Sequence, residues 1–186
     1  EGRDVEEQKP ELEEGEKGVV SPEKFYQTAQ ELINGGREKE AIGALGVFLG
    51  LYPDYAPAHN DLGFLYYNEG DQGKALKHYQ QAVMLAPDNS IFQKTLADFY
   101  YAVLGREEDA LEHYGRALSS NPDDIGILLM LGHISLSKKK SDEAEIFYNM
   151  VLKIEPGNKD ARQMLDGMVK GRGVGGRRTE DGGRRT

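Results

Sequence analysis

At 186 residues, with 38% apolar and 30% charged side chains, the chain has the length and composition of one globular domain with a sizeable core. Its longest apolar run, residues 41–52, is too short for a membrane-spanning helix, which needs about 20 residues. The net charge of −9, without a basic stripe, argues against nucleic acid as the main partner. The absence of Cys excludes disulfides and thiolate ligands.

The N-terminal segment, residues 1–20, is acidic and has few large apolar side chains. Such a segment cannot bury enough surface to offset the entropy of ordering, so we expect it to be disordered. It lacks a basic region followed by an apolar core, so no secretory signal is predicted, and we expect a cytoplasmic protein without a membrane partner. The first helix is predicted directly after it, with Ser21 as N-cap and Pro22 at the first helical position.

A period of 34 or 35 residues runs through the chain from residue 22 to residue 158. It is marked by four prolines and, eight residues before each, by a large side chain: Pro53, Pro87, Pro122 and Pro156, with Leu45, Tyr79, Tyr114 and Tyr148. Twelve residues before each proline lies an alanine: Ala41, Ala75, Ala110 and Ala144. Five residues before each proline lies one of Phe48, Ala82, Ala117 and Val151. This periodicity predicts two helices per repeat, A and B, joined by a short turn, and the recurring residues before each proline are predicted to face inward from helix B. The third repeat has one extra residue near Leu104, so its A–B turn should bulge.

The pattern resembles the tetratricopeptide repeat, most fully in "APAHNDLGFLYYNEGDQGKALKHYQQAVMLAPDN". The resemblance implies an all-α, right-handed superhelical solenoid of antiparallel helix pairs. The repeats are expected at about residues 22–55, 56–89, 90–124 and 125–158. One hairpin cannot bury its apolar stripe alone, so stacked repeats need a terminal cap. Residues 159–170 are the predicted capping helix and complete a domain over 21–170, while the Gly- and Arg-rich residues 171–186 are predicted to be a flexible tail.

In the resembled family the A helices line a concave groove, which positions 2, 5, 9 and 12 of each repeat are expected to face. The candidate partner-binding residues at these positions are Tyr26, Gln30, Ile33, Asn60, Phe64, Tyr67, Lys94, Asp98, Tyr101, Leu129, His133 and Leu136. They are mostly aromatic or apolar, so we expect the groove to bind an apolar or aromatic segment of a partner protein, either a helix or an extended peptide. The alternative is that several of them pack against neighbouring A helices as core.

Some members of the resembled family hold acidic C-terminal peptides with a clamp of Lys, Asn and Arg side chains in this groove. Only Lys94 and Asn60 could serve here, and Asp98, one turn from Lys94, is expected to compete for it. The sequence therefore predicts that this clamp is absent.

A second candidate contact face lies in helix B of the first repeat, in the stretch "AIGALGVFLG". Gly43, Gly46 and Gly50 share its outward face, and each costs about 1 kcal/mol of helix propensity relative to Ala. Either another element approaches this backbone closely, such as the N-terminal segment or a second copy, or tertiary packing tolerates a weak surface helix.

No catalytic or metal-binding motif is present, and the four His residues do not form a catalytic or metal-binding constellation. Glu107, Glu108 and Asp109 are interpreted as favourable charges at a helix N-terminus. We therefore predict a non-catalytic protein–protein interaction module without cofactor or metal. Two alternatives are a targeting or regulatory domain of a larger, transferase-type enzyme and a self-assembling scaffold that forms a homo-oligomer.

Overall fold

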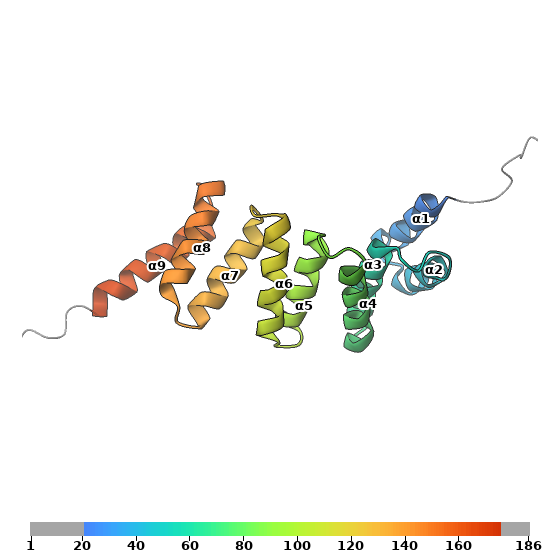
Figure 1. Ribbon diagram of the computed structural model, residues 1–186, viewed down its shortest axis with the longest axis horizontal. Helices are drawn as coiled ribbons and strands as arrows, with labels where there is room; N and C mark the ends of the chain where they lie inside the picture. The colour runs from blue at the N-terminus through green and yellow to red at the C-terminus, as the bar shows by residue number, and fades with distance from the viewer. Residues whose placement is uncertain (1–20, 176–186) are drawn as a thin grey trace, which may run out of the picture. The chain divides into compact units, whose positions relative to one another are not determined.

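The computed structural model describes residues 21–175, with side chains to residue 170, and this part of the chain contains nine α-helices and no strand (Figure 1). The expectations for residues 1–20 and for the end of the tail lie outside the described residues. The chain divides into two compact units, Glu1–Pro53 and Asp54–Thr186. The predicted all-helical repeat fold is confirmed.

The first unit contains helices α1 (Pro22–Asn34) and α2 (Glu38–Leu51). The Ser21 hydroxyl accepts a hydrogen bond from the Lys24 amide at 3.3 Å, which confirms the predicted N-cap. Phe48 is fully buried, and its ring lies 5.8 Å from that of Tyr26, so these two aromatic side chains join α1 to α2.

The second unit contains seven described helices. They are α3 (Ala56–Asn68), α4 (Gln72–Leu85), α5 (Ser90–Ala102), α6 (Glu107–Ser120), α7 (Ile125–Ser137), α8 (Ser141–Ile154) and α9 (Lys159–Gly175). The helices pack as the hairpins α3–α4, α5–α6 and α7–α8, and each hairpin also contacts the next helix along the chain (Figure 1). The side chains predicted to face inward from helix B are buried: Ala75, Tyr79, Ala82, Ala110, Tyr114, Ala117, Ala144, Tyr148 and Val151.

The tyrosines of the B helices pack against small residues of the A helices. A Cβ placed on Gly63 would lie 2.6 Å from the Tyr79 ring, and one on Gly132 would lie 2.6 Å from the Tyr148 ring. In the α5–α6 hairpin the same position holds Ala97, which is also fully buried. The small residues of the repeat therefore give the aromatic rings room to lie against the helix backbone.

In most repeats the turn between helices A and B is spanned by a backbone hydrogen bond from an amide to the carbonyl five residues earlier. The Asp71 amide donates to the Tyr66 carbonyl at 2.9 Å, five residues back, whereas the Arg106 amide donates to the Tyr100 carbonyl at 2.8 Å, six residues back. The predicted bulge in the third repeat is confirmed by this longer closure. Positive φ angles occur in these turns at Gly36, Gly70, Gly105 and Lys139.

Helix α9 covers the last hairpin. Ala161 is fully buried, and Met164, Leu165 and Met168 are half-buried against the cluster that includes Tyr148 and Val151. The helix continues to Gly175, beyond the predicted end at residue 170, because extending an existing helix costs less than starting one. The first residues of the predicted flexible tail are therefore helical.

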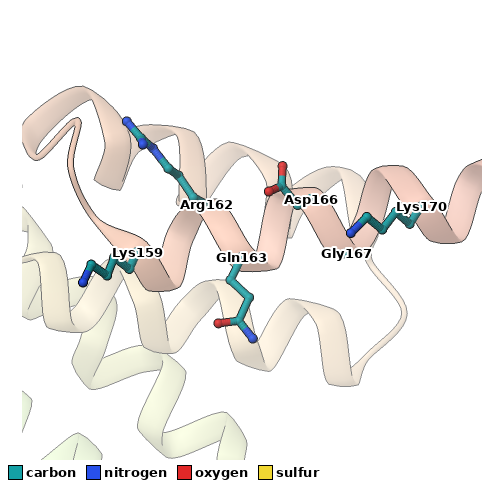
Figure 2. Close-up of a pocket in the computed structure, with 6 residues that line it drawn as sticks. All are labelled: Lys159, Arg162, Gln163, Asp166, Gly167 and Lys170. Carbon is teal, nitrogen blue, oxygen red and sulfur yellow. The ribbon is translucent and has the colours of Figure 1, made fainter.

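The outward side of α9 is polar. Six residues surround a shallow depression there: Lys159, Arg162, Gln163, Asp166, Gly167 and Lys170. Figure 2 shows that the side chains project from this one helix in different directions, so they do not converge on a common point. This surface has the polar outer face that a terminal helix of a repeat array requires.

No helix in the described part of the chain combines the length and apolar character needed to cross a bilayer.

Candidate partner-binding site

A hollow of about 200 Å³ lies against helices α3, α4 and α5 of the second unit. We call it the aromatic hollow. It is lined by Phe64, Tyr67, Tyr79, Thr95, Asp98, Phe99, Ala102 and Val103. Three of these, Phe64, Tyr67 and Asp98, are predicted groove residues, so the structure brings them together around one site.

The aromatic rings of the hollow are held by packing against one another. The Tyr67 and Phe99 rings lie 6.0 Å apart at 85°, and the Tyr79 and Phe99 rings lie 5.3 Å apart at 56°. Edge-to-face geometry of this kind is favourable for aromatic pairs. Phe64 and Tyr67 nevertheless remain 46% and 45% exposed, so both aromatic side chains are accessible to a partner.

Asp98 supplies a carboxylate to the hollow. Its Oδ1 accepts a hydrogen bond from the Tyr114 hydroxyl at 2.5 Å. Burial, together with this hydrogen bond, raises the pKa of Tyr114, so the phenol keeps its proton and remains a donor. Burial also raises the pKa of Tyr79 to about 12, with smaller contributions from Tyr67 and the negative charge of Asp61.

Lys94 does not pair with Asp98, which corrects the expectation from their spacing. Its ammonium lies 3.0 Å and 3.2 Å from the two carboxylate oxygens of Asp124, and Asp124 also caps α7 by accepting from the Ile127 amide at 3.0 Å. Burial raises the pKa of Asp124, but the hydrogen bonds from Ile127 and Lys94 outweigh it, so the pKa lies below its ordinary value. Lys94 is therefore paired with the carboxylate that caps α7, the first helix of the next repeat.

The other predicted groove residues of the second unit do not line the aromatic hollow. In the second unit, His133 is exposed with its ring 5.8 Å from Tyr148, and Leu129 and Leu136 are half-buried against the cluster under α9. Asn60 and Tyr101 are half-buried as well.

Three predicted groove residues belong to the first unit. Gln30 is exposed, Ile33 is half-buried, and Tyr26 is only 9% exposed. Tyr26 packs on Phe48, so its side chain lies in the core of the α1–α2 hairpin.

Five lining residues of the hollow were absent from the sequence prediction. Thr95, Phe99 and Ala102 follow one another on a single side of α5 at spacings of four and three residues, which is the signal that could have found them. Val103 follows directly after the helix, and Tyr79 comes from α4, where it was assigned to the core.

The second candidate contact face, on α2, is open. Nothing lies within 4 Å of a Cβ placed on Gly43, Gly46 or Gly50. Val47 and Leu51, on the same side of the helix, are 62% and 63% exposed. This face is therefore apolar and uncovered by other described residues.

Within the part of the chain that the structure describes, no group of three or more His, Asp or Glu side chains is placed to hold a metal ion.

Comparison with known protein families identifies the repeats. Two family models described as "Tetratricopeptide repeat" match residues 56–89 and residues 104–166, which together make up more than half of the chain. The chain belongs to the tetratricopeptide repeat family. The matched ranges include the α3–α4 hairpin that supplies Phe64, Tyr67 and Tyr79.

This tetratricopeptide repeat protein resembles parts of longer relatives. It is 30% identical over 112 residues to DnaJ homolog subfamily C member 3 of Mus musculus. The aligned region covers 60% of this chain and 22% of that protein. It is 35% identical over 69 residues to photosystem I assembly protein Ycf3 of Synechococcus sp., covering 36% of this chain and 40% of that protein. The chain thus spans about a fifth of the mouse relative's length.

Among solved structures, the tetratricopeptide repeat protein is similar to one from Parabacteroides merdae. The TM-score is 0.73 at 22% identity, over 82% of this chain and 60% of that one. At this identity the likeness supports the fold alone. Fold and family together make the chain a protein–protein interaction module.

Proposed function

We propose that this tetratricopeptide repeat protein binds a partner peptide or helix through the aromatic hollow and does not itself catalyse a reaction. The observation that carries the proposal is the exposure of Phe64 and Tyr67 beside a hollow whose base is otherwise tightly packed. Exposed aromatic rings in a concave, preformed setting are the usual anchors of binding energy at protein interfaces.

The size of the hollow suits one large apolar side chain. An apolar cavity of about 150 Å³ accommodates a benzene ring, and the hollow measures about 200 Å³. Covering the two ring faces would also remove apolar surface from water, at roughly 25 cal/mol per Å². A partner with a single aromatic or aliphatic anchor side chain therefore fits this site best.

The chemistry of the hollow favours binding over catalysis. General acid–base catalysis near neutral pH works best with a group whose pKa lies near 7. The Tyr114 phenol, which donates to Asp98, has its pKa raised by burial and by that hydrogen bond, and burial raises the pKa of Tyr79 to about 12. Both phenols are therefore poor proton donors at neutral pH.

The test begins with peptides selected from a display library of random sequences of about a dozen residues, using the full chain as bait. Affinities of the selected peptides are then measured by isothermal titration calorimetry for the wild type and for the double variant Phe64→Ala and Tyr67→Ala. Loss of two anchors should weaken binding at least about tenfold.

Met84→Ala is the matched control, because Met84 is 66% exposed on α4 and does not line the hollow. It should leave the affinity unchanged. Circular dichroism checks that both variants keep the helical fold. Peptides that bind the double variant as tightly as the wild type would place the binding site elsewhere.

A second candidate function is self-association through the open face of α2. The exposed Val47 and Leu51 side chains beside three uncovered glycines favour it, because such a face allows two helix backbones to approach closely. Sedimentation velocity over a range of concentrations should then detect a dimer that the double variant Val47→Glu and Leu51→Glu abolishes. A wild-type protein that stays monomeric at the highest concentration would rule this out.

A further inference from the structure

We infer that the aromatic hollow selects partner segments that carry a Lys or Arg side chain close to the apolar side chain that fills it. This inference rests on the proposed function, because it assigns the partner chemistry of the same site. Its basis is the carboxylate of Asp98, which lies at the hollow and is exposed.

The Asp98 carboxylate keeps acceptor capacity for a ligand. Its Oδ1 accepts from the Tyr114 hydroxyl, and a carboxylate has about four lone-pair sites on its two oxygens. Among residues 21–170 Asp98 forms no ion pair, unlike Asp71, Asp109 and Asp124. A cation from outside the described chain would therefore gain both a charge partner and a hydrogen-bond acceptor there.

The nearest cation on the same helix does not neutralise Asp98. Lys94 lies one turn earlier, but its ammonium is held 3.0 Å from Asp124 Oδ1 in a pair whose side chains are only 34% and 20% exposed. Among the residues that line the hollow, Asp98 is the one charged side chain, and the whole chain carries −9.

The exposed rings beside Asp98 would also favour a cation. A guanidinium or ammonium placed over the face of an aromatic ring is attracted by the ring's quadrupole. The protein already makes such contacts elsewhere: the Lys74 ammonium lies 4.8 Å from the centre of the Tyr66 ring, and the Arg106 guanidinium lies 4.7 Å from that of Tyr100. Tyr67 offers a ring of the same type that is 45% exposed.

An acidic partner is disfavoured by the same charges. A ligand carboxylate near Asp98 would meet like charge, and Lys94, the cation that could attract it, is already paired with Asp124. The preference is thus opposite to that of the Lys, Asn and Arg clamp. The apolar side chain that fills the hollow therefore supplies most of the affinity, and Asp98 favours segments with a basic residue close to that side chain.

The experiment is a selection from the random peptide display library against the full chain, run in parallel on the wild type and on Asp98→Asn. The Asn side chain can still accept the Tyr114 hydrogen bond, so this variant should keep its fold. Asp123→Asn is the matched control, because it makes the same change in net charge on an exposed residue that does not line the hollow.

Wild-type and Asp123→Asn selections should both enrich Lys or Arg within a few residues of an aromatic or aliphatic side chain. The Asp98→Asn selection should lose the basic preference but keep the apolar one. Affinity of a basic peptide should fall about fivefold in Asp98→Asn, and replacing its Lys with Gln should have little effect in that variant.

Two failures can be told apart. Peptides that require Tyr67 but show no basic preference, or bind Asp98→Asn equally well, would overturn this inference and leave the proposed function standing. Peptides insensitive to both Tyr67→Ala and Asp98→Asn would overturn both. Enrichment of acidic residues would contradict the inference directly.

Discussion

In the α5–α6 hairpin the buried Gln93 side chain donates to the Pro87 carbonyl at 2.6 Å and pairs through its oxygen with His113 at 2.7 Å. In the α7–α8 hairpin the two equivalent positions hold Leu128 and Phe147. One hairpin therefore has a hydrogen-bonded polar pair at positions where the other has two apolar side chains of one hydrophobic cluster.

The tyrosines of these two hairpins differ in the same way. Both are fully buried, but the Tyr114 hydroxyl donates to Asp98, whereas the Tyr148 hydroxyl has no hydrogen-bond partner in the described structure. The position equivalent to Asp98 is His133. The repeat thus determines where a side chain lies, and the individual residue determines whether its polar atoms are satisfied.

The largest expected difference between the hairpins concerns the small residue beneath each tyrosine. Gly132→Ala would place a Cβ 2.6 Å from the Tyr148 ring and should destabilise the protein by about 1–3 kcal/mol in urea unfolding. The reciprocal Ala97→Gly in the α5–α6 hairpin relieves no clash and should cost about 1 kcal/mol through helix propensity. A stabilising effect of Gly132→Ala would show that Tyr148 can move aside at no cost.

The next largest difference between the two hairpins should be the change in stability when each tyrosine hydroxyl is removed. Tyr114→Phe deletes a hydrogen bond to a carboxylate and should cost about 1.5–2 kcal/mol. Tyr148→Phe deletes a buried hydroxyl without a partner and should be neutral or stabilising in the same unfolding assay. Equal losses in the two variants would mean that Tyr148 finds a partner in solution.

Acid sensitivity should also be greater in the α5–α6 hairpin than in the α7–α8 hairpin. Burial, assisted by Arg116, lowers the pKa of His113 below its ordinary value of 6.5. The unfolded chain therefore binds the proton first, so the stabilisation is complete above pH 6.5 and falls as the pH drops below it. The double variant Gln93→Leu and His113→Phe places the side chains of the α7–α8 hairpin at these positions, so its free energy of unfolding should fall less than that of the wild type between pH 7 and 5.

The remaining acid sensitivity provides an internal reference for that measurement. Burial lowers the pKa of His78 to about 4, with a smaller effect from His59, so His78 acts in the same direction in both proteins. If the free energy of unfolding changed with pH in the same way in the double variant and the wild type, His113 would take no part in the acid sensitivity.

The smallest expected effect lies in the A–B turns. Gly105 has a φ of 63° in the α5–α6 turn, and Lys139 has a φ of 60° in the α7–α8 turn. This left-handed conformation is costly for a residue with a Cβ, so Lys139→Gly should stabilise the protein by about 0.5–1 kcal/mol. Gly105→Lys should destabilise it by a similar amount, and a rise in thermal midpoint for both variants would contradict the argument.

The sequence predicted the repeat fold well because each inward position recurs in every unit. Tyr79, Tyr114 and Tyr148 are buried as expected, and the single extra residue near Leu104 lengthens its turn as expected. These features depend on local spacing, which a single sequence displays directly.

The site was predicted less completely because it depends on distant neighbours. Helical spacing suggested Asp98 as the partner of Lys94, but the partner is Asp124, thirty residues further along the chain. Burial also varied among equivalent positions: Tyr26 is only 9% exposed, whereas Asn60 and Leu129, at the same position of their own repeats, are half-buried. Such differences arise from packing between helices and are not visible in periodicity.

The lengthened turn of the third repeat adjoins the aromatic hollow. Val103, a lining residue, belongs to the segment in which the Arg106 amide closes onto Tyr100, and Ala102 directly precedes it. Inserting or deleting a residue there would reshape the aromatic hollow while leaving the helices on either side in register. A repeat protein of this design can thus diversify its ligands through loop length, without changing the residues that hold its scaffold together.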